Sequence, residues 1–441
     1  MKHHHLLSIL AAAGILLPAQ HAAAFTSPLP EFGEAIHLAP KKGKKDKKGK
    51  KKKILPVSSK QLFSPTEKQI AKAEEYLDSI GQPSYEDAIK NDDDKALYAI
   101  LTTGEATAQQ ALFAACRWGK THYVKLLLKA PDIDLNCENS WDGTPLNIAI
   151  QHGHLKTVKL LATSPGIDVN RRKEQIGISP FGSAVEAYHK EMVQFLMRVP
   201  KIKIGNYSEL ELAIFKGDTA EVKRILTEQK PNINKKTELE NNADNSGGTP
   251  LIYAAGFGHT DIVKLLLEQP NININIIDDN GISALTAAAM HGHVDIMTIL
   301  LQRPEIIINR QYHSRQHHEG KNPLPYAAKN GHSEAVRLLV NIPEIVEEKI
   351  EENGEALYLA AENGHSEVVR LLVNIPWMVE ENGEVAFISA IEEKHVKCVK
   401  ILLSTGKIDV NKPFRGETPL EIATRKSSEE IQELLRKAGA K

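Results

Sequence analysis

The sequence predicts an all-α solenoid of about eleven helix–turn–helix units, and three observations support this fold class. Only 5% of the 441 residues are aromatic, which argues against a large sandwich or barrel and favours helices packed through Leu, Ile, Val and Ala. Residues 327–343 and 360–376 agree at fifteen of seventeen positions at an offset of 33, so this segment was duplicated. Weaker copies recur over most of the chain, which is typical of stacked repeats.

Residues 1–24 have the features of a secretory signal peptide. Lys2 supplies the positive start, and Leu6 to Ala19 form an apolar run that is short for a membrane span. Ala22 to Ala24 offer small residues for cleavage before Phe25. We therefore expect an exported protein, either periplasmic or secreted. The alternative is an N-terminal membrane anchor that stays attached.

Residues 25–63 are predicted to be a disordered linker with a lysine-rich tract at 41–53. Ten lysines and one aspartate give the tract a charge of +9, whereas the chain without this tract and Lys2 carries −11. Such a tract is a solvated spacer or binds anionic polymers and lipid head groups, but it has no aromatic residue or arginine to read bases. The candidate polyanion-binding residues are Lys41, Lys42, Lys44, Lys45, Lys47, Lys48, Lys50, Lys51, Lys52 and Lys53.

A capping helix is predicted over residues 64–83, ahead of a repeat domain at 84–441. Ser64 as N-cap, Pro65 at the first helical position and Glu67 as the capping-box acid start this helix. Gly81 ends it, because glycine adopts the left-handed conformation without steric cost.

Each repeat unit is expected to turn sharply between its two helices. The duplicated segment has a Gly-His pair at this point, and the pair or a weaker copy of it recurs along the chain. The eleven turn residues are Asp92, Gly119, Gly153, Tyr188, Gly217, Gly258, Gly292, Gly331, Gly364, Lys394 and Ser427. An apolar second helix follows each turn, and a proline usually stops it. These prolines are Pro131, Pro165, Pro200, Pro270, Pro304, Pro343 and Pro376.

The first helix of several units begins with Thr-Pro-Leu. Thr144, Thr249 and Thr418 are predicted N-caps, each followed by proline at N1. Alanine pairs such as 327–328 let neighbouring helices approach closely. One unit buries too little apolar surface to fold alone, so we expect the core to form by stacking.

These motifs resemble those of the ankyrin repeat family, whose unit of about 33 residues is a β-turn followed by two short antiparallel helices. The Thr-Pro-Leu segments and the Ile-Asp-Val-Asn type of run at 133–136, 167–170 and 408–411 carry the resemblance. It implies a β-turn finger between successive units and a protein-binding scaffold that is not an enzyme. The family usually has a histidine after Thr-Pro-Leu, and this chain departs from that pattern, with Asn147 and Ile252 at two such positions.

No motif for catalysis or a cofactor is found, and we expect neither an enzyme nor a bound cofactor or metal. The turn histidines lie one stacking step apart, so we assign them a structural role at the turns. The insert with His313, His317, His318 and Glu319 has spacing that suits a metal ion, but a polar loop is the simpler interpretation. Of the three cysteines, Cys116 and Cys398 are predicted to be buried, and Cys137 lies at the base of a finger.

The resemblance also implies a binding surface, formed by the finger tips and by the two residues before each turn residue. Large apolar or acidic side chains at these positions are candidate contacts for a protein partner, because exposed aromatic residues often anchor interfaces. They are Trp118, His152, Phe215, Phe257, Met290, His291, Glu362 and Glu392, with Trp141 at a finger tip and Trp377 as a weaker candidate. The alternative is that some of these rings pack against an adjacent finger.

We expect a monomer that binds a protein partner and no specific nucleic acid. The competing hypothesis is an envelope- or polymer-associated protein that is held by its lysine-rich tract, with the repeats in a structural role.

Overall fold

The computed structural model describes residues 65–139, 143–172, 178–237, 247–308, 321–347 and 351–441. Within these residues the chain forms 24 helices and no strand, with isolated β-bridges at the bases of three fingers. The signal sequence, the lysine-rich tract, Trp141 and the His313–Glu319 insert lie outside the described residues.

The helices form eleven pairs behind an N-terminal helix, α3 (Glu67–Ile80), which confirms the predicted solenoid of helix–turn–helix units. Units 1 to 5 are α4 (Tyr85–Lys90) with α5 (Asp94–Thr103), α6 (Ala108–Arg117) with α7 (Thr121–Leu127), α8 (Pro145–Gln151) with α9 (Leu155–Ala162), α10 (Pro180–Glu186) with α11 (Lys190–Leu196), and α12 (Glu209–Lys216) with α13 (Thr219–Glu228).

Units 6 to 11 continue the same pattern to the C-terminus. They are α14 (Pro250–Gly256) with α15 (Thr260–Leu267), α16 (Ala284–Met290) with α17 (Val294–Leu301), α18 (Pro323–Lys329) with α19 (Ser333–Val340), α21 (Glu351–Glu362) with α22 (Ser366–Leu372), α23 (Pro376–Glu392) with α24 (Val396–Ser404), and α25 (Pro419–Arg425) with α26 (Glu429–Lys437). A short helix, α20 (Pro343–Val346), stands between units 8 and 9.

All eleven predicted turn residues adopt the left-handed conformation, with φ from +50° at Tyr188 to +75° at Gly364. Seven of them are glycines, for which this conformation has no steric cost. The three Thr-Pro-Leu caps are also confirmed, because each threonine hydroxyl accepts a hydrogen bond from the backbone N–H three residues later.

The predicted N-cap of the first helix is wrong. Helix α3 begins at Glu67, and Thr66 is its N-cap, with extended backbone and a capping box to Gln69. The Gln69 side chain accepts a hydrogen bond from the Thr66 N–H at 2.9 Å, which leaves Glu67 without the capping-box role. The predicted end is confirmed, since Gly81 has φ +80°.

The predicted β-turn finger is replaced by helix after units 8 and 9. Pro343 and Pro376 each follow a finished helix, but each also occupies the first position of a new one. Proline is favoured there because its missing N–H has no partner in the first turn anyway. In unit 10 the new helix runs on as the unit's first helix, so α23 has 17 residues.

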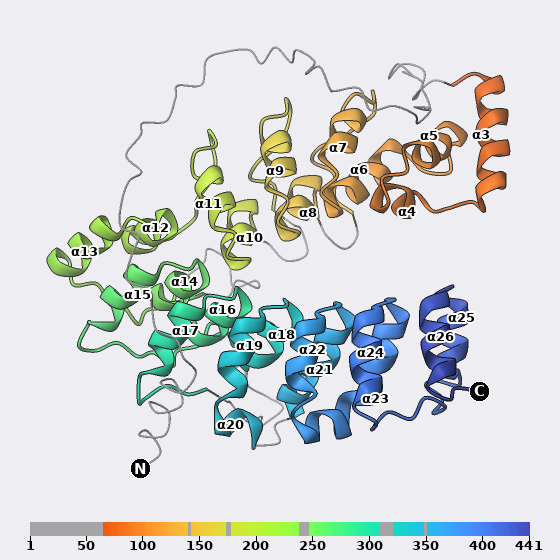
Figure 1. Cartoon of the computed structure of the whole chain (residues 1–441). Helices are drawn as coiled ribbons and strands as arrows, with labels where there is room; N and C mark the ends of the chain where they lie inside the picture. The colour runs from red at the N-terminus through yellow and green to blue at the C-terminus, as the bar shows by residue number, and fades with distance from the viewer. Residues whose placement is uncertain (1–64, 140–142, 173–177, 238–246, 309–320, 348–350) are drawn as a thin grey trace, which may run out of the picture.

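The solenoid bends back on itself in the middle (Figure 1). An N-terminal arm, α3 to α11, and a C-terminal arm, α16 to α26, run side by side in opposite directions and are joined through α12 to α15. The hydrophobic core is continuous through both arms. No described helix is both long and apolar enough to cross a bilayer.

Candidate partner-binding surface

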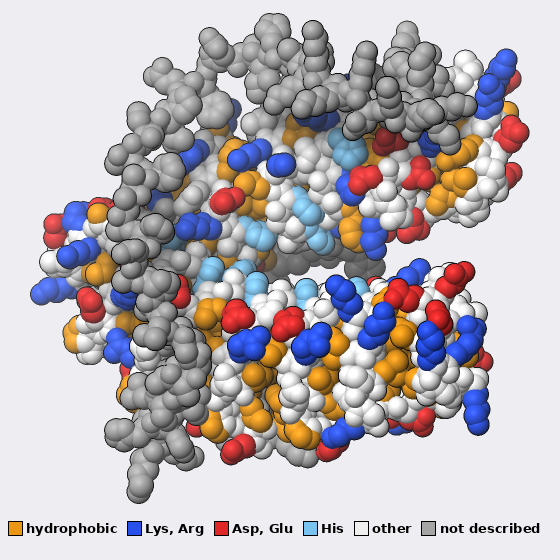
Figure 2. Space-filling view, viewed as in Figure 1, with side chains coloured by type: hydrophobic (Ala, Val, Ile, Leu, Met, Phe, Trp, Pro, Cys, Tyr) orange, Lys and Arg blue, Asp and Glu red, His pale blue; other side chains and the backbone are white. Residues whose placement is uncertain are grey.

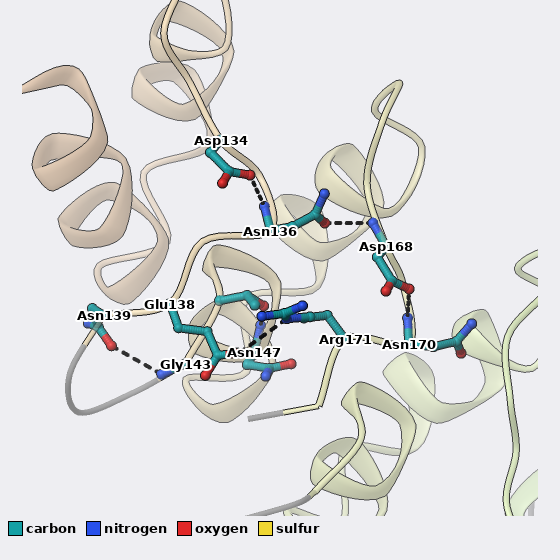
Figure 3. Close-up of polar contacts among 10 residues, drawn as sticks. Asp134, Asn136, Glu138, Asn139, Gly143, Asn147, Asp168, Asn170 and Arg171 are labelled. Carbon is teal, nitrogen blue, oxygen red and sulfur yellow. Dashed lines mark hydrogen bonds and ion pairs between the residues drawn. The ribbon is translucent and has the colours of Figure 1, made fainter. Parts of the chain in front are cut away.

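Asparagines at the bases of the fingers join successive units. The Asn136 side chain donates a hydrogen bond to the Gly166 carbonyl at 2.8 Å. It also accepts one from the Asp168 N–H at 2.7 Å (Figure 3). The same pair of bonds is made by Asn170, Asn234, Asn275 and Asn411 to the following unit or C-terminal segment. Each amide thus satisfies one donor and one acceptor of the next chain segment and fixes its register. We call these contacts the asparagine links.

The turn histidines form a second set of connections. Each ring lies over the turn glycine of the preceding unit, where an added Cβ would come within 2.4 to 3.1 Å of a ring atom. The glycine is therefore needed both for its left-handed backbone and for this close approach. Five of the rings also place Nε2 at 2.8 to 3.0 Å from a carbonyl oxygen of the preceding unit, and they are His154, His293, His332, His365 and His395. We call these bonded pairs the histidine links. The predicted structural role of these histidines is confirmed.

In the part of the chain that the structure describes, the junction between units 4 and 5 has neither link. Gly205 stands at the place of the linking asparagine, Asp218 at the place of the turn histidine, and Tyr188 at the place of the glycine. Junctions from unit 2 to unit 11 otherwise carry at least one of the two links, and units 1 and 2 are joined by the Lys120–Asp92 ion pair at 2.5 Å. The missing links fall where the solenoid bends (Figure 1).

Aromatic side chains fill this junction instead. Phe215 on α12 lies with its ring centroid 4.9 Å from Tyr207, 5.3 Å from Tyr253 and 5.5 Å from Phe257. Phe181 on α10 completes the group, 5.8 Å from Tyr207. With Tyr188, six of the chain's 20 Phe and Tyr residues gather here. Edge-to-face ring packing therefore replaces the links at the bend.

Tyr188 closes the inner side of the bend. Its ring covers Gly256, and a Cβ added at Gly256 would lie 2.1 Å from a ring atom, so only glycine fits there. It also packs edge-on against Phe257 at 5.7 Å and His291 at 5.3 Å. Unit 4 therefore contacts units 6 and 7 directly. Tyr188 was predicted as a turn residue, but its role at the bend was missed; the signal for it was a bulky residue at a turn position that favours glycine.

Two predicted surface anchors are wrong because their rings are buried at the bend. Phe215 is 0% exposed and Phe257 is 3% exposed, so neither ring is available to a partner. Tyr188 from unit 4 packs against Phe257, and Phe215 lies within the aromatic group described above. Met290 and His291 are partly buried at the same place, with Met290 packed against the core.

Among the described residues, Trp118 is the tryptophan or phenylalanine candidate that stays exposed. Its indole is 38% exposed, and it is the one aromatic residue among the exposed large hydrophobic side chains of the described residues. The Lys90 ammonium lies 4.8 Å from its ring centroid, and the neighbouring Arg117 guanidinium lies 3.5 Å from Glu86. His152, one unit further along, is also exposed.

The candidates in the C-terminal arm differ in exposure. Glu362 is exposed, whereas Glu392 is partly buried and lies 3.8 Å from the Arg425 guanidinium. Trp377, the weaker candidate, is wrong as a surface anchor, because it is 6% exposed and its indole N–H donates to the Val346 carbonyl at 2.7 Å. That bond connects the helical segments after units 8 and 9, where the described residues form no asparagine link.

The space-filling view shows an open cleft between the two arms, with histidine side chains along its walls (Figure 2). Among the described residues, no group of three or more His, Cys, Asp or Glu side chains is placed to hold a metal ion. Cys116 and Cys398 are buried as predicted, and burial raises the pKa of the Cys398 thiol to about 11. Such thiols are poor nucleophiles at neutral pH.

Eleven stacked helix pairs with inter-unit links define a helical-repeat solenoid. The family model that describes ankyrin repeats (3 copies) matches residues 86–173, 210–312, 305–378 and 374–441. Together these ranges cover well over half of the chain. The chain therefore belongs to the ankyrin repeat family. The profile does not match residues 174–209, the segment with α10, α11 and the finger at the bend.

Known relatives share part of this repeat region. Mouse Rabankyrin-5 is 26% identical over 171 residues, which is 37% of this chain and 14% of the relative, so the chain spans only a small part of that protein. The putative ankyrin repeat protein FPV223 of fowlpox virus (strain NVSL) is 30% identical over 147 residues, 33% of this chain and 96% of the relative. The human ASB11 ankyrin repeat domain matches in structure with a TM-score of 0.42 at 21% identity, covering 53% of this chain and 99% of that domain.

Proposed function

We propose that this chain is an exported, non-enzymatic scaffold that binds a protein partner in the cleft between its two arms. Ankyrin repeats are generally protein–protein interaction modules, and the family is typically not enzymatic. The observation that carries the proposal for this chain is Trp118, a large ring left in solvent on the N-terminal arm while the other aromatic candidates of the described residues are buried. Exposed tryptophan is a frequent interface anchor because it buries a large area with few rotatable bonds.

The test is capture of partners from the exported fraction by the wild-type chain and by Trp118→Ala. We expect the variant to keep its thermal stability within about 0.5 kcal/mol, because the ring is exposed, and to bind at least about 30-fold more weakly. Trp377→Ala is the control, since its ring is buried and its loss should lower stability while leaving the cleft surface of folded protein unchanged. Equal capture by Trp118→Ala would refute the proposed anchor.

The lysine-rich tract supports a second candidate function, attachment to an anionic polymer or membrane surface. Its +9 charge within thirteen residues is the observation that favours it. The full chain should be retained on anionic vesicles, whereas a chain without residues 25–63 should not be. Retention of the full chain should fall steeply as the salt concentration rises. Partner capture through Trp118 should depend much less on salt, which separates the two functions.

Export itself is tested by the N-terminus of the mature protein. Cleavage after Ala24 predicts material outside the cytoplasm that begins at Phe25. Mature exported protein that still begins at Met1 would contradict the signal peptide.

A further inference from the structure

Two histidine rings, those of His259 and His291, are buried at the bend, where desolvation opposes their charged form. His291 packs edge-on against Tyr188, and its Nε2 is buried with no hydrogen-bond partner among the described residues. His259 lies over Gly217 and is 8% exposed, and its buried Nε2 likewise has no such partner. The five histidines of the histidine links place this same atom on a carbonyl oxygen.

The groups around these two rings are mostly basic. Besides burial, Lys190 on α11 and His293 before α17 lower the pKa of His259. Likewise, His293, His189 and His332 lower the pKa of His291. The acids Asp278 and Glu186 lie near Tyr188, where they add to burial in raising the pKa of its hydroxyl. A proton added to either ring would therefore meet several basic neighbours and a desolvated position, both of which oppose the charge.

We propose that the bend is an acid-opened hinge: protonation of His291 and His259 separates Tyr188 from Phe257 and lets the two arms swing apart. The junction between units 4 and 5 is suited to this because it has no asparagine or histidine link to hold it once the ring contacts are lost. Opening there leaves the stacks on either side intact, since repeat units interact only with their neighbours.

The direction of the pH dependence follows from the state of the rings. Burial, followed by the basic neighbours, lowers the pKa of both His259 and His291 to about 4, against an ordinary value of 6.5. A histidine whose pKa is lowered in the closed form stabilises that form at pH values above the ordinary pKa of histidine. Closure therefore weakens as the pH falls from about 6.5 towards 4, with the closed-to-open ratio dropping about tenfold per pH unit for each histidine.

The experiment measures the radius of gyration of the full chain by small-angle X-ray scattering between pH 7.5 and pH 4. We expect the wild type to expand as the pH falls below about 6 while its helical circular dichroism persists. His291→Phe keeps an aromatic ring against Tyr188 and cannot be protonated, so its expansion should move to lower pH by about one unit. The matched control is His152→Phe, because His152 has the same position before its turn glycine, the same 6.1 Å stacking partner two residues on, and an exposed ring.

Three results would overturn the proposal. They are a constant radius from pH 7.5 to pH 4, an unchanged transition in His291→Phe, or an equal shift in His152→Phe, which would assign the effect to general changes in charge. If His291→Phe does not fold, hydrogen exchange of the wild type decides instead. Protection should then be lost first at 185–190 and 253–260 as the pH falls, and uniform loss along the chain would reject the hinge.

Discussion

The two kinds of junction in this solenoid differ in what holds neighbouring units together. In the regular stacks, an asparagine or histidine side chain from one unit bonds the backbone of the next, as Asn170 does to Lys201 and Lys203. At the junction of units 4 and 5, six aromatic rings meet instead, with Gln194 donating to the Lys216 carbonyl at 3.0 Å. Directional backbone bonds fix the register of a straight stack, whereas ring packing tolerates a change of direction. Among the described residues, the bend coincides with the one junction from unit 2 to unit 11 that has neither link.

The largest expected effect comes from removing the centre of the aromatic cluster. Phe215→Ala deletes a ring that is 0% exposed and packs with rings from units 4, 5 and 6. We expect a loss of about 3–5 kcal/mol at this junction, because a buried cavity replaces the ring. Urea unfolding should then separate into two transitions, one for each arm, since nearest-neighbour stacks divide at their weakest interface.

Phe387→Ala is the matched control in the regular part of the chain. Its ring is also fully buried, at 1% exposure, but it lies within α23 in the C-terminal arm. We expect a similar loss of stability that is confined to that arm, as followed by hydrogen exchange. If both variants unfold in the same single step, the junction between units 4 and 5 is not more weakly coupled than the regular junctions.

The next largest effect concerns a turn glycine under a histidine ring. Gly292→Ala forces a left-handed alanine, and its Cβ would lie 2.6 Å from the His332 ring. Gly406→Ala has the same backbone problem, with φ +66°, but nothing lies within 4 Å of its Cβ. We expect about 1–2 kcal/mol of destabilisation for Gly406→Ala, and at least about 1 kcal/mol more for Gly292→Ala.

Thermal unfolding of the double variant Gly292→Ala/His332→Ala isolates the steric part. Without the ring, the extra cost of the alanine at position 292 should disappear. Persistence of the full cost would mean that the ring moves freely and that the close approach to glycine is not a constraint.

The sequence predicted the repeat architecture because the turn residues are local and periodic. All eleven turn positions followed from copies of one duplicated motif, including non-glycine residues such as Lys394 and Ser427. The partner-binding residues were harder to predict, because exposure depends on contacts between distant units. Phe257 occupies a predicted binding position in its own unit, but it packs against Phe215 of the preceding unit and against Tyr188 from two units away. The helical segment of α23 was missed because proline was interpreted as a stop signal alone, although it also starts helices.

A smaller effect is expected from a single asparagine link. Asn170→Ala removes one donated bond of 2.9 Å and one accepted bond of 2.7 Å between units 3 and 4. We expect about 1–2 kcal/mol of destabilisation, because both backbone groups lose their partner near the surface, where water replaces it in part. Asn374→Ala is the control, since within the described residues its side chain donates a hydrogen bond to the Arg370 carbonyl of its own unit and makes none to a neighbouring unit.

Hydrogen exchange at Lys203 adds a local measurement for this link, because its N–H donates to Asn170. Faster exchange there in Asn170→Ala, but not in Asn374→Ala, is the expected result. No difference between the two variants in stability or exchange would show that side-chain packing alone fixes this interface and that the asparagine does not stabilise it.

The smallest effect is expected from the ion pairs that cross unit boundaries on the surface. The Lys400 ammonium lies 2.9 Å from the Glu430 carboxylate and joins units 10 and 11, but their side chains are 50% and 61% exposed. Water and salt screen such a pair, and ordering two long side chains has an entropic cost, so we expect a coupling of under about 0.5 kcal/mol. A double-mutant cycle with Lys400→Ala and Glu430→Ala measures this coupling directly, and it should vanish in 1 M salt. A coupling as large as that of an asparagine link, and insensitive to salt, would mean that surface charge rather than backbone bonding holds the regular stacks together.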